Sequence, residues 1–190
     1  MAIQNTQDYT GKYITGSEIV KRANDEGHLI AIHSYDHLAL PGLTDKEILN
    51  NELVRTKNII TNLIGKPPIY FRPPYGRIND RVNNIAKALD LKTVLWSCLS
   101  ADSSTEPAVT LDGSFKYKHG PVDIYNNIMR NTESRSIILC HDGHSGTYDA
   151  NFGIVSALDK AIPELQKKGF NFVTIDEFLA TGSEKFSESS

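Results

Sequence analysis

Two histidines, His33 and His37, stand four residues apart directly after an apolar run at residues 29–32. Two imidazoles at the end of a buried strand can hold one divalent metal ion, and imidazole nitrogen suits zinc, cobalt or nickel. A catalytic metal ion usually takes at least three protein ligands. The alternative is an incidental pair with no ligand role. A metal site therefore predicts a carboxylate ligand, a proton donor and an oxyanion donor elsewhere in the chain.

A stiff turn, Arg72-Pro73-Pro74-Tyr75-Gly76, follows a second apolar segment. The two prolines fix their own φ angles and restrict the residue before each of them. Such stiffness can hold Arg72 where it orients a carboxylate, and can hold one backbone N–H as an oxyanion donor. The alternative is a rigid strand-to-helix connection without a chemical role.

A third apolar run, residues 137–140, ends in His141. An imidazole with a pKa near neutrality can protonate a leaving group, so His141 is a candidate general acid. A capping or surface histidine is the alternative. Trp96 and Leu139 are candidates for an apolar wall around a small group such as a methyl, with core packing as the alternative for each.

The chain has 190 residues, of which 39% are hydrophobic and 23% charged, as expected for a globular domain with a core. Its formal net charge is -3 and it contains no Lys/Arg block, which argues against nucleic acid and anionic membranes as partners. No apolar run is long enough to span a membrane. Residues 1–6 contain no basic start and no apolar stretch of the length that a signal peptide needs, so we expect no signal peptide in this chain.

Apolar periodicity and capping signals predict alternating strands and helices, which favours an α/β architecture with parallel strands. One domain is expected over residues 1–182, with a disordered polar tail at 183–190. Five strands suit a small or incomplete barrel better than an eight-stranded one. No glycine-rich loop follows the first strand, which argues against a Rossmann sheet. The predicted strands are 29–32, 69–71, 93–97, 136–140 and 172–174, and the predicted helices are about 17–27, 45–64, 80–89, 122–130, 151–168 and 176–180.

The candidate residues share a position in this architecture. Each polar group follows the carboxyl end of a predicted strand, the edge at which active sites form in parallel α/β folds. Four segments share this position: His33 and His37, residues 72–76, residues 96–102, and His141 with Asp142. Their coincidence is stronger evidence for a site than any one motif.

Taken in order, these segments resemble the motifs of the NodB-homology polysaccharide deacetylases, carbohydrate esterase family four. His-Ser-Tyr-Asp-His at residues 33–37 resembles the second motif of that family, and Phe-Arg-Pro-Pro-Tyr-Gly at 71–76 resembles the highly specific third. Residues 96–102 resemble the fourth motif, and Leu-Cys-His at 139–141 the fifth. The resemblance extends over residues 17–179.

The resemblance implies a distorted (β/α) barrel and a metal-dependent hydrolase that acts on carbon–nitrogen bonds other than peptide bonds. Its substrate would be an acetylated polysaccharide such as chitin, peptidoglycan or acetylated xylan, met outside the cell or at the cell surface. By motif position His33 and His37 would bind the metal. Zinc is the default ion, and cobalt or nickel are alternatives.

The same resemblance implies roles for the other candidates. Arg72 would orient the catalytic base, and the backbone N–H of Tyr75 would help to stabilise the oxyanion. His141 would act as general acid, while Trp96 and Leu139 would line the acetate pocket.

Two departures from the family pattern matter. The first motif, Thr-Phe-Asp-Asp-Gly, carries the base and an aspartate metal ligand, and residues 1–32 do not contain it. Thr-Leu-Asp-Gly at 110–113 is only a superficial echo, with one aspartate in the wrong place. The fourth motif keeps Asp102, which we count with the oxyanion and substrate-binding residues, but has Ser103 in place of tryptophan.

We therefore expect a barrel without its N-terminal strand or strands and a metal site without its third protein ligand. Such a chain would bind metal weakly and deacetylate little. Open strand edges would favour pairing with an N-terminal fragment or with another copy of the chain. The alternatives are a carbohydrate-binding pseudoenzyme without turnover and an assembly fragment.

Overall fold

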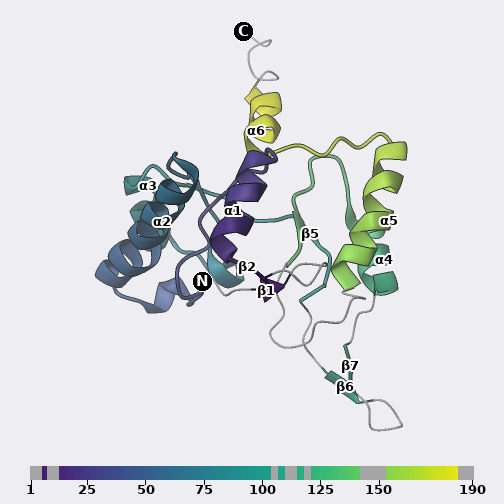
Figure 1. The fold of residues 1–190 in the computed structure, drawn as a ribbon, viewed down its shortest axis with the longest axis horizontal. Helices are drawn as coiled ribbons and strands as arrows, with labels where there is room; N and C mark the ends of the chain where they lie inside the picture. The colour runs from purple at the N-terminus through teal and green to yellow at the C-terminus, as the bar shows by residue number, and fades with distance from the viewer. Residues whose placement is uncertain are drawn as a thin grey trace. The chain divides into compact units, whose positions relative to one another are not determined.

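A computed structural model describes residues 6–7, 13–103, 107–109, 115–117, 121–141 and 153–183 (Figure 1). The chain divides into two compact units, Met1–Leu95 and Trp96–Ser190, called here the first and second unit. Each is described by itself. Nearly all of the predicted tail, and the segment 110–113, lie outside the described residues, so those predictions stay predictions.

The first unit opens with a short antiparallel pair, β1 (Thr6–Gln7) and β2 (Tyr13–Ile14), which the sequence did not predict. Helix α1 (Gly16–Asp25) follows, two residues shorter at its end than the predicted 17–27, and its N-cap is Thr15. The Thr15 hydroxyl accepts from the Glu18 N–H while the Glu18 carboxylate accepts from the Thr15 N–H, a reciprocal cap. The remaining elements are η1 (Leu40–Gly42), η2 (Glu47–Val54), α2 (Arg55–Ile64), β3 (Tyr70–Phe71), η3 (Pro74–Gly76), α3 (Asp80–Ala88) and β4 (Lys92–Thr93).

The helix predicted over 45–64 is present, but its first half is not an α-helix. Residues Glu47–Val54 form a π-helix, η2, which continues into α2 and ends where Gly65 takes a left-handed φ of 74°. A π-helix is rare and wider than an α-helix, and it is frequent at functional sites. Its buried residues are Ile48, Glu52 and Leu53, so a carboxyl group is turned inward beside two aliphatic side chains.

The core of the first unit packs on a short row of backbone segments that pair in parallel. Ile32 bridges Phe71, and β3 pairs in parallel with β4. The predicted strands 29–32 and 93–97 are therefore too long, since regular pairing is limited to Ile32 and to residues 92–93. Pro73 has no N–H with which to continue the row beyond Arg72, which accounts for the early end of pairing in 93–97. Residues 29–31 precede the Ile32 bridge, and no described strand pairs with them.

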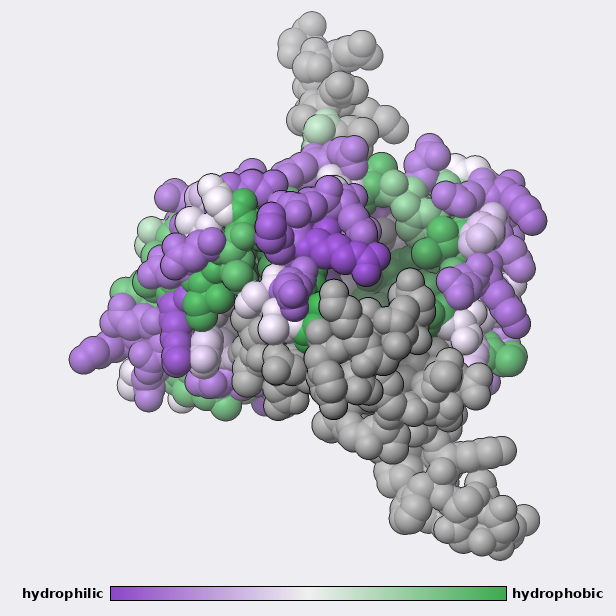
Figure 2. Space-filling view, in the orientation of Figure 1, coloured by the Kyte–Doolittle hydropathy of each residue, from purple (hydrophilic) through white to green (hydrophobic). Residues whose placement is uncertain are grey.

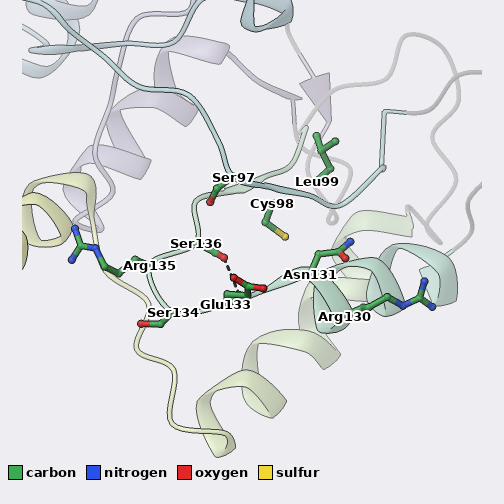
Figure 3. A pocket seen from close by; sticks show the side chains of 9 residues that line it. All are labelled: Ser97, Cys98, Leu99, Arg130, Asn131, Glu133, Ser134, Arg135 and Ser136. Atoms are coloured by element: carbon green, nitrogen blue, oxygen red, sulfur yellow. Dashed lines mark hydrogen bonds between the residues drawn. The ribbon is translucent and has the colours of Figure 1, made fainter.

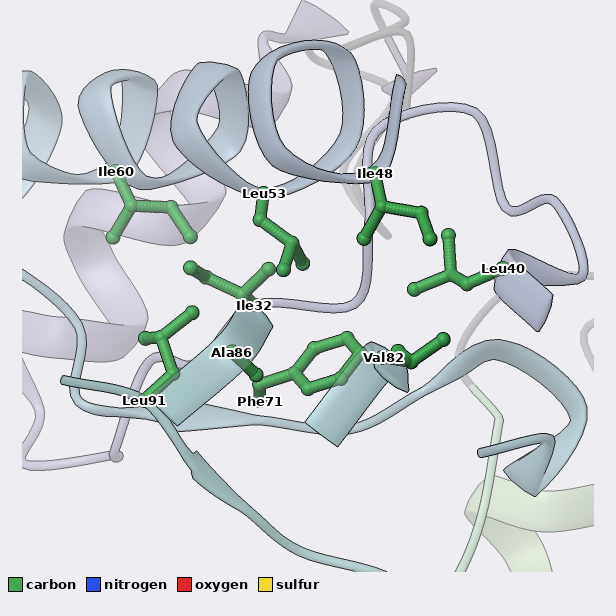
Figure 4. Close-up of a cluster of buried hydrophobic side chains, with 9 residues drawn as sticks. All are labelled: Ile32, Leu40, Ile48, Leu53, Ile60, Phe71, Val82, Ala86 and Leu91. Atoms are coloured by element: carbon green, nitrogen blue, oxygen red, sulfur yellow. The ribbon is translucent and has the colours of Figure 1, made fainter. Parts of the chain in front are cut away.

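Helices pack on this row through one apolar cluster. Figure 4 shows Ile48, Leu53 and Ile60 pointing from the helix toward Ile32 and Phe71. Helices α1 and α3 pack against the η2–α2 helix. The buried cluster is Ile32, Leu40, Ile48, Leu53, Ile60, Phe71, Val82, Ala86 and Leu91.

In the second unit, β5 (Cys98–Leu99) pairs in parallel with β8 (Ile138–Leu139), in the register Cys98↔Ile138 and Leu99↔Leu139. An antiparallel hairpin, β6 (Pro107–Val109) with β7 (Phe115–Tyr117), lies between the predicted strand 93–97 and the predicted helix 122–130, where the sequence predicted neither strand nor helix. Helices α4 (Pro121–Asn131) and α5 (Gly153–Lys167) pack on each other, and α6 (Ile175–Ser183) follows. Their shared core is Ile124, Ile128, Ile154, Ala157, Ala161 and Leu165.

The strand predicted at 172–174 is wrong. A strand requires a paired neighbour, and no described residue pairs with this segment, where Phe172 and Val173 are about half exposed. Among the coloured residues in Figure 2, hydrophilic side chains predominate on the visible face, and hydrophobic ones reach the surface between them. Across the described ranges, no helix has both the length and the apolar character needed to cross a membrane.

The predicted α/β class is confirmed, with parallel strand pairs alternating with helices in an incomplete barrel. Within the described segments the parallel pairs are separated by helices and do not join into a closed barrel. Each parallel pair ends in a candidate residue, because Arg72 follows β3 and His141 follows β8 by two residues.

Candidate active site

The first unit brings four predicted site residues together. The ring centroids of His33 and His37 are 4.9 Å apart with an interplanar angle of 68°, and the His37 ring is 4.8 Å from that of Tyr75. Arg72 joins them through its backbone carbonyl, 2.7 Å from His33 Nδ1. Both imidazoles are exposed, as a ligand for a metal or substrate must be.

The contact with Arg72 defines the tautomer of His33. A carbonyl oxygen can only accept a hydrogen bond, so Nδ1 of His33 must carry the proton. The lone pair of a neutral imidazole is then on Nε2, the nitrogen that faces away from this contact. A second hydrogen bond that fixes ring orientation and tautomer is a usual feature of metal-binding histidines.

The loop between the two histidines is tightly folded. Ser34 and His37 adopt left-handed φ angles of 62° and 56°, which non-glycine residues seldom take. The His37 N–H donates to the buried Ser34 Oγ at 3.0 Å. Oε2 of Glu52 accepts from the N–H groups of Tyr35 and Asp36, at 2.9 and 3.0 Å.

The sequence analysis missed Glu52. A signal was available, because Glu52 is four residues after Ile48 and eight before Ile60, in line with the apolar face of the predicted helix. A charged side chain on that face must be satisfied by a specific partner.

The proline turn after β3 also has a left-handed residue. Tyr75 has a φ of 58° inside η3, with a buried Pro74 before it, and its side chain is exposed. Backbone bonds from Gly76 to Pro73 and from Arg77 to Pro74 close the turn. Among the described residues none accepts a hydrogen bond from the Tyr75 N–H, so this donor is available for an oxyanion.

The second unit brings Asp102 and His141 together. Oδ1 of Asp102 is 2.9 Å from Nδ1 of His141, and Oδ2 accepts the backbone N–H of His141 at 2.5 Å. The side chain of Asp102 is 5% exposed, whereas that of His141 is 38% exposed. An acceptor at Nδ1 leaves Nε2 as the nitrogen that can exchange a proton with a reactant.

Buried polar groups orient Asp102. The Ser100 Oγ is 2.9 Å from Asp102 Oδ1 and 2.7 Å from the carbonyl oxygen of Leu139, and it accepts from the Asp102 N–H at 3.3 Å. Nδ2 of Asn127 donates to the Ser100 carbonyl at 3.3 Å. Neither Ser100 nor Asn127 was identified from the sequence, because an ordinary polar side chain gives no signal of its own, even for Ser100 within the segment 96–102.

The two residues predicted to line an acetate pocket are both half-buried. Leu139 lies on β8 opposite Leu99, two residues before His141. Trp96 lies in the segment that leads into β5. Their role as an apolar wall stays a prediction, and Asp142, next to His141, lies outside the described residues.

A separate cavity of about 560 Å³ lies at the amino end of β8 (Figure 3). Its position is opposite to that of His141, and none of the predicted site residues lines it. The Arg130 and Arg135 side chains point away from each other. The lining residues are Ser97, Cys98, Leu99, Arg130, Asn131, Glu133, Ser134, Arg135 and Ser136.

The donor set for a metal ion comprises two imidazoles. In the part of the chain that the structure describes, no three His, Cys, Asp or Glu side chains are grouped to hold an ion. His33 and His37 are close enough to share one, and the tautomer of His33 suits this role. These two residues therefore fit a divalent metal as two of its ligands.

Comparison with known proteins begins with a family model. The model described as Polysaccharide deacetylase matches residues 2–94, which includes the histidine pair and the proline turn. Two peptidoglycan-N-acetylglucosamine deacetylases of Bacillus cereus extend the similarity into the second unit. One is 34% identical over 167 residues and the other 35% identical over 161 residues.

These alignments cover 88% and 85% of the chain. The chain spans 54% of the length of the first relative and 68% of the second. Among solved structures, the Bc1960 peptidoglycan N-acetylglucosamine deacetylase aligns with a TM-score of 0.70 at 34% identity. That alignment covers 85% of this chain and 67% of the other.

Proposed function

The chain belongs to the polysaccharide deacetylase family, and on that basis we propose that it is a deacetylase domain for N-acetylglucosamine polymers. The reaction is hydrolysis of an N-acetyl group, which yields acetate and a free amine. One observation supports this most directly. The two described groups of polar residues, His33–His37–Arg72 and Asp102–His141, follow the carboxyl ends of parallel strand pairs.

His33 and His37 would hold a divalent metal ion, with zinc as the default. When bound, such an ion supplies Lewis-acid polarisation of the acetyl carbonyl and a more acidic water. The residues of the chain prepare for this. The Arg72 carbonyl orients His33, and the Tyr75 N–H adds a hydrogen-bond donor for the carbonyl oxygen as it becomes negative.

His141 would protonate the leaving nitrogen. As the carbon–nitrogen bond breaks, the Nε2 proton passes to the sugar nitrogen, which leaves as an amine. Asp102 keeps Nδ1 as the donor and stabilises the imidazolium before this transfer. Trp96 and Leu139 would exclude water around the acetyl methyl group.

Attack by water needs a base, and Arg72 would orient its carboxylate. The described residues do not supply that carboxylate, and the sequence Asp-Asp-Gly occurs nowhere in the 190 residues. A missing general base costs about 10²–10⁴-fold in rate. We therefore propose that this chain alone is a slow enzyme.

The names of the two Bacillus cereus relatives support peptidoglycan as the substrate. Peptidoglycan is a polymer of the cell wall, so we also propose that the protein acts at the cell surface. Chitin oligomers and acetylated xylan share the acetyl group but differ in the polymer, and they serve as the competing substrates in the test.

The test measures acetate released by the 190-residue chain with added zinc from peptidoglycan fragments, chitin oligomers and acetylated xylan. We expect release from the peptidoglycan fragments, about 10²–10⁴-fold slower than by a Bacillus cereus relative measured alongside. Chelator and His141→Ala should each abolish it. No release above the His141→Ala background on any substrate would contradict the proposal.

A further inference from the structure

The loop that carries the histidine pair is held from behind by a buried glutamate. We propose that Glu52 is a positioning residue, which keeps the backbone of residues 34–37 in the shape that brings His33 and His37 to one metal ion. This inference rests on the proposed metal site. It adds a role for a residue of the helix, and that role can fail while the metal site stands.

The contacts of Glu52 are specific to this loop. Its side chain is 2% exposed, and its Oε2 accepts from the N–H groups of Tyr35 and Asp36 at 2.9 and 3.0 Å. These are two of the three residues between His33 and His37. A buried carboxyl oxygen with two backbone donors fixes the direction of both peptide groups.

The loop needs such a contact because its backbone is unusual. Ser34 and His37, at its two ends, both have left-handed φ angles, and neither is glycine. Residues held in this region persist only where the surroundings over-determine them. The His37 N–H bond to Ser34 closes the turn from within, and Glu52 fastens its middle to the helix.

The π-helix accounts for the reach of Glu52. In η2 the buried residues are Ile48, Leu53 and Glu52, so one turn contributes two aliphatic side chains to the core and one carboxyl group to the loop. The hydrogen bonds of a π-helix join residues five apart, so residues four and five apart both lie near one face of it. Glu52 and Leu53 therefore share the buried face of Ile48.

The same helix also binds the loop through the side chain of Tyr35. Nη2 of Arg55 donates to the Tyr35 hydroxyl at 2.9 Å, and the Arg55 guanidinium carbon is 3.5 Å from the Tyr35 ring centroid. Glu52 and Arg55 are three residues apart, and both bind Tyr35. Glu52 accepts from its backbone N–H, and Arg55 donates to its side-chain hydroxyl. The helix therefore holds the loop at Tyr35 by two independent contacts.

Glu47 provides the matched control. It is on the same π-helix, and its Oε2 accepts from the N–H and hydroxyl of Thr44 at 2.8 and 2.7 Å. Its removal perturbs the start of the helix without touching residues 33–37. Glu47→Ala should therefore alter stability and leave the histidine pair in place.

The experiment titrates zinc into the 190-residue chain and into Glu52→Ala, Glu52→Gln and Glu47→Ala, with thermal unfolding of each metal-free protein. We expect Glu52→Ala to weaken zinc affinity about 10–100-fold, as for other partners that orient a ligand. Glu52→Gln keeps an oxygen acceptor and should recover most of that loss. Glu47→Ala should bind zinc like the parent. A folded Glu52→Ala with the affinity of the parent overturns the proposal.

A replacement variant and a measurement without zinc complete the experiment. If Glu52→Ala does not fold, Glu52→Met takes its place, because it fills the buried volume without a strong acceptor. NMR contacts between the His33 and His37 rings in the metal-free protein provide a readout that does not depend on zinc. If the parent binds no zinc, the metal site of the proposed function fails. Ring contacts that are present in the parent and lost in the variant would then still support the positioning role, and ring contacts that survive in the variant would overturn it.

Discussion

The two units fix their candidate histidines by different means. In the first unit the Nδ1 of His33 donates to a backbone carbonyl, that of Arg72, and the surrounding loop is shaped by left-handed residues. In the second unit the Nδ1 of His141 faces the carboxylate of Asp102, which Ser100 orients. A neutral carbonyl suits an imidazole that offers a lone pair to a metal, whereas a carboxylate suits one that gains and loses a proton.

This difference separates the two tasks of the proposed reaction, ligand binding and proton transfer. Mutations in the two units should therefore have different effects. Changes in the second unit should alter the rate of acetate release and leave zinc affinity unchanged, whereas changes around His33 and His37 should alter zinc affinity itself.

The largest expected effect is that of Asp102→Asn. The amide cannot stabilise an imidazolium, and it can impose the wrong tautomer on His141, so acetate release should fall about 10³–10⁴-fold. Zinc affinity should remain that of the parent. Steady-state acetate release and zinc titration on the same preparation check both halves. A parallel loss of zinc affinity would show that the two tasks are not separable.

Next in size is the stability of the two cores. Leu53→Ala in the first core and Leu165→Ala in the second each remove a buried side chain. Each should destabilise its own unit by about 2–5 kcal/mol through lost burial and the cavity left behind. Amide hydrogen exchange can be followed separately in α2 and in α4. Equal acceleration in both helices for either variant would contradict the separation of the two cores.

A smaller effect is expected for Ser100→Ala. This change removes the hydroxyl that bonds Asp102 but leaves the contacts between Asp102 and His141. Acetate release should fall about 10-fold, within the range of a lost hydrogen bond to a charged group. Kinetics at saturating zinc measure this. A loss as large as that of Asp102→Asn would mean that Ser100 contributes more than orientation.

The smallest effect concerns pH. Hydrogen bonds from the hydroxyl and then the N–H of Thr44 hold the pKa of Glu47 below its ordinary value of 4.5. A lowered pKa contributes stability above pH 4.5 that is lost as the pH falls through the pKa of the folded state. Glu47→Gln should therefore be less stable than the parent at pH 7, and this difference in stability should shrink below pH 4.5. Thermal unfolding of both proteins from pH 7 to 3 would measure it.

The second unit offers the same test at the start of α6. There the N–H and hydroxyl of Thr174 donate to Glu177 and lower the pKa of that carboxyl. The difference in stability between Glu177→Gln and the parent should likewise be present at pH 7 and shrink below pH 4.5. A difference from the parent that grows toward pH 3 would contradict the sign for either residue.

The positions of the candidate site residues could be predicted because polar groups follow apolar runs at the ends of parallel strands. His33, Arg72 and His141 all stand at such positions, and the proline turn was specific enough to indicate a family. The ends of some helices could also be predicted from the sequence. The helix over 45–64 ends at Gly65, where the left-handed φ suits glycine.

Other features depend on long-range contacts that no local pattern encodes. The π-helix gives Glu52 its place, and its sequence has the apolar spacing of an ordinary helix. The strand predicted at 172–174 has the right composition, but a strand also needs a paired neighbour. The β6–β7 hairpin lies in a polar segment with no alternation strong enough to reveal it.

The most direct test of the site is zinc titration of the 190-residue chain and four histidine variants. His33→Ala and His37→Ala should each lower the zinc affinity by more than the ~100-fold typical of a residue that only orients a ligand. His141→Ala should bind like the parent, because its imidazole serves proton transfer. His28→Ala, an exposed histidine of the first unit, is the matched control. Parent-like zinc affinity in His33→Ala or His37→Ala would contradict the assignment of this pair as the metal site.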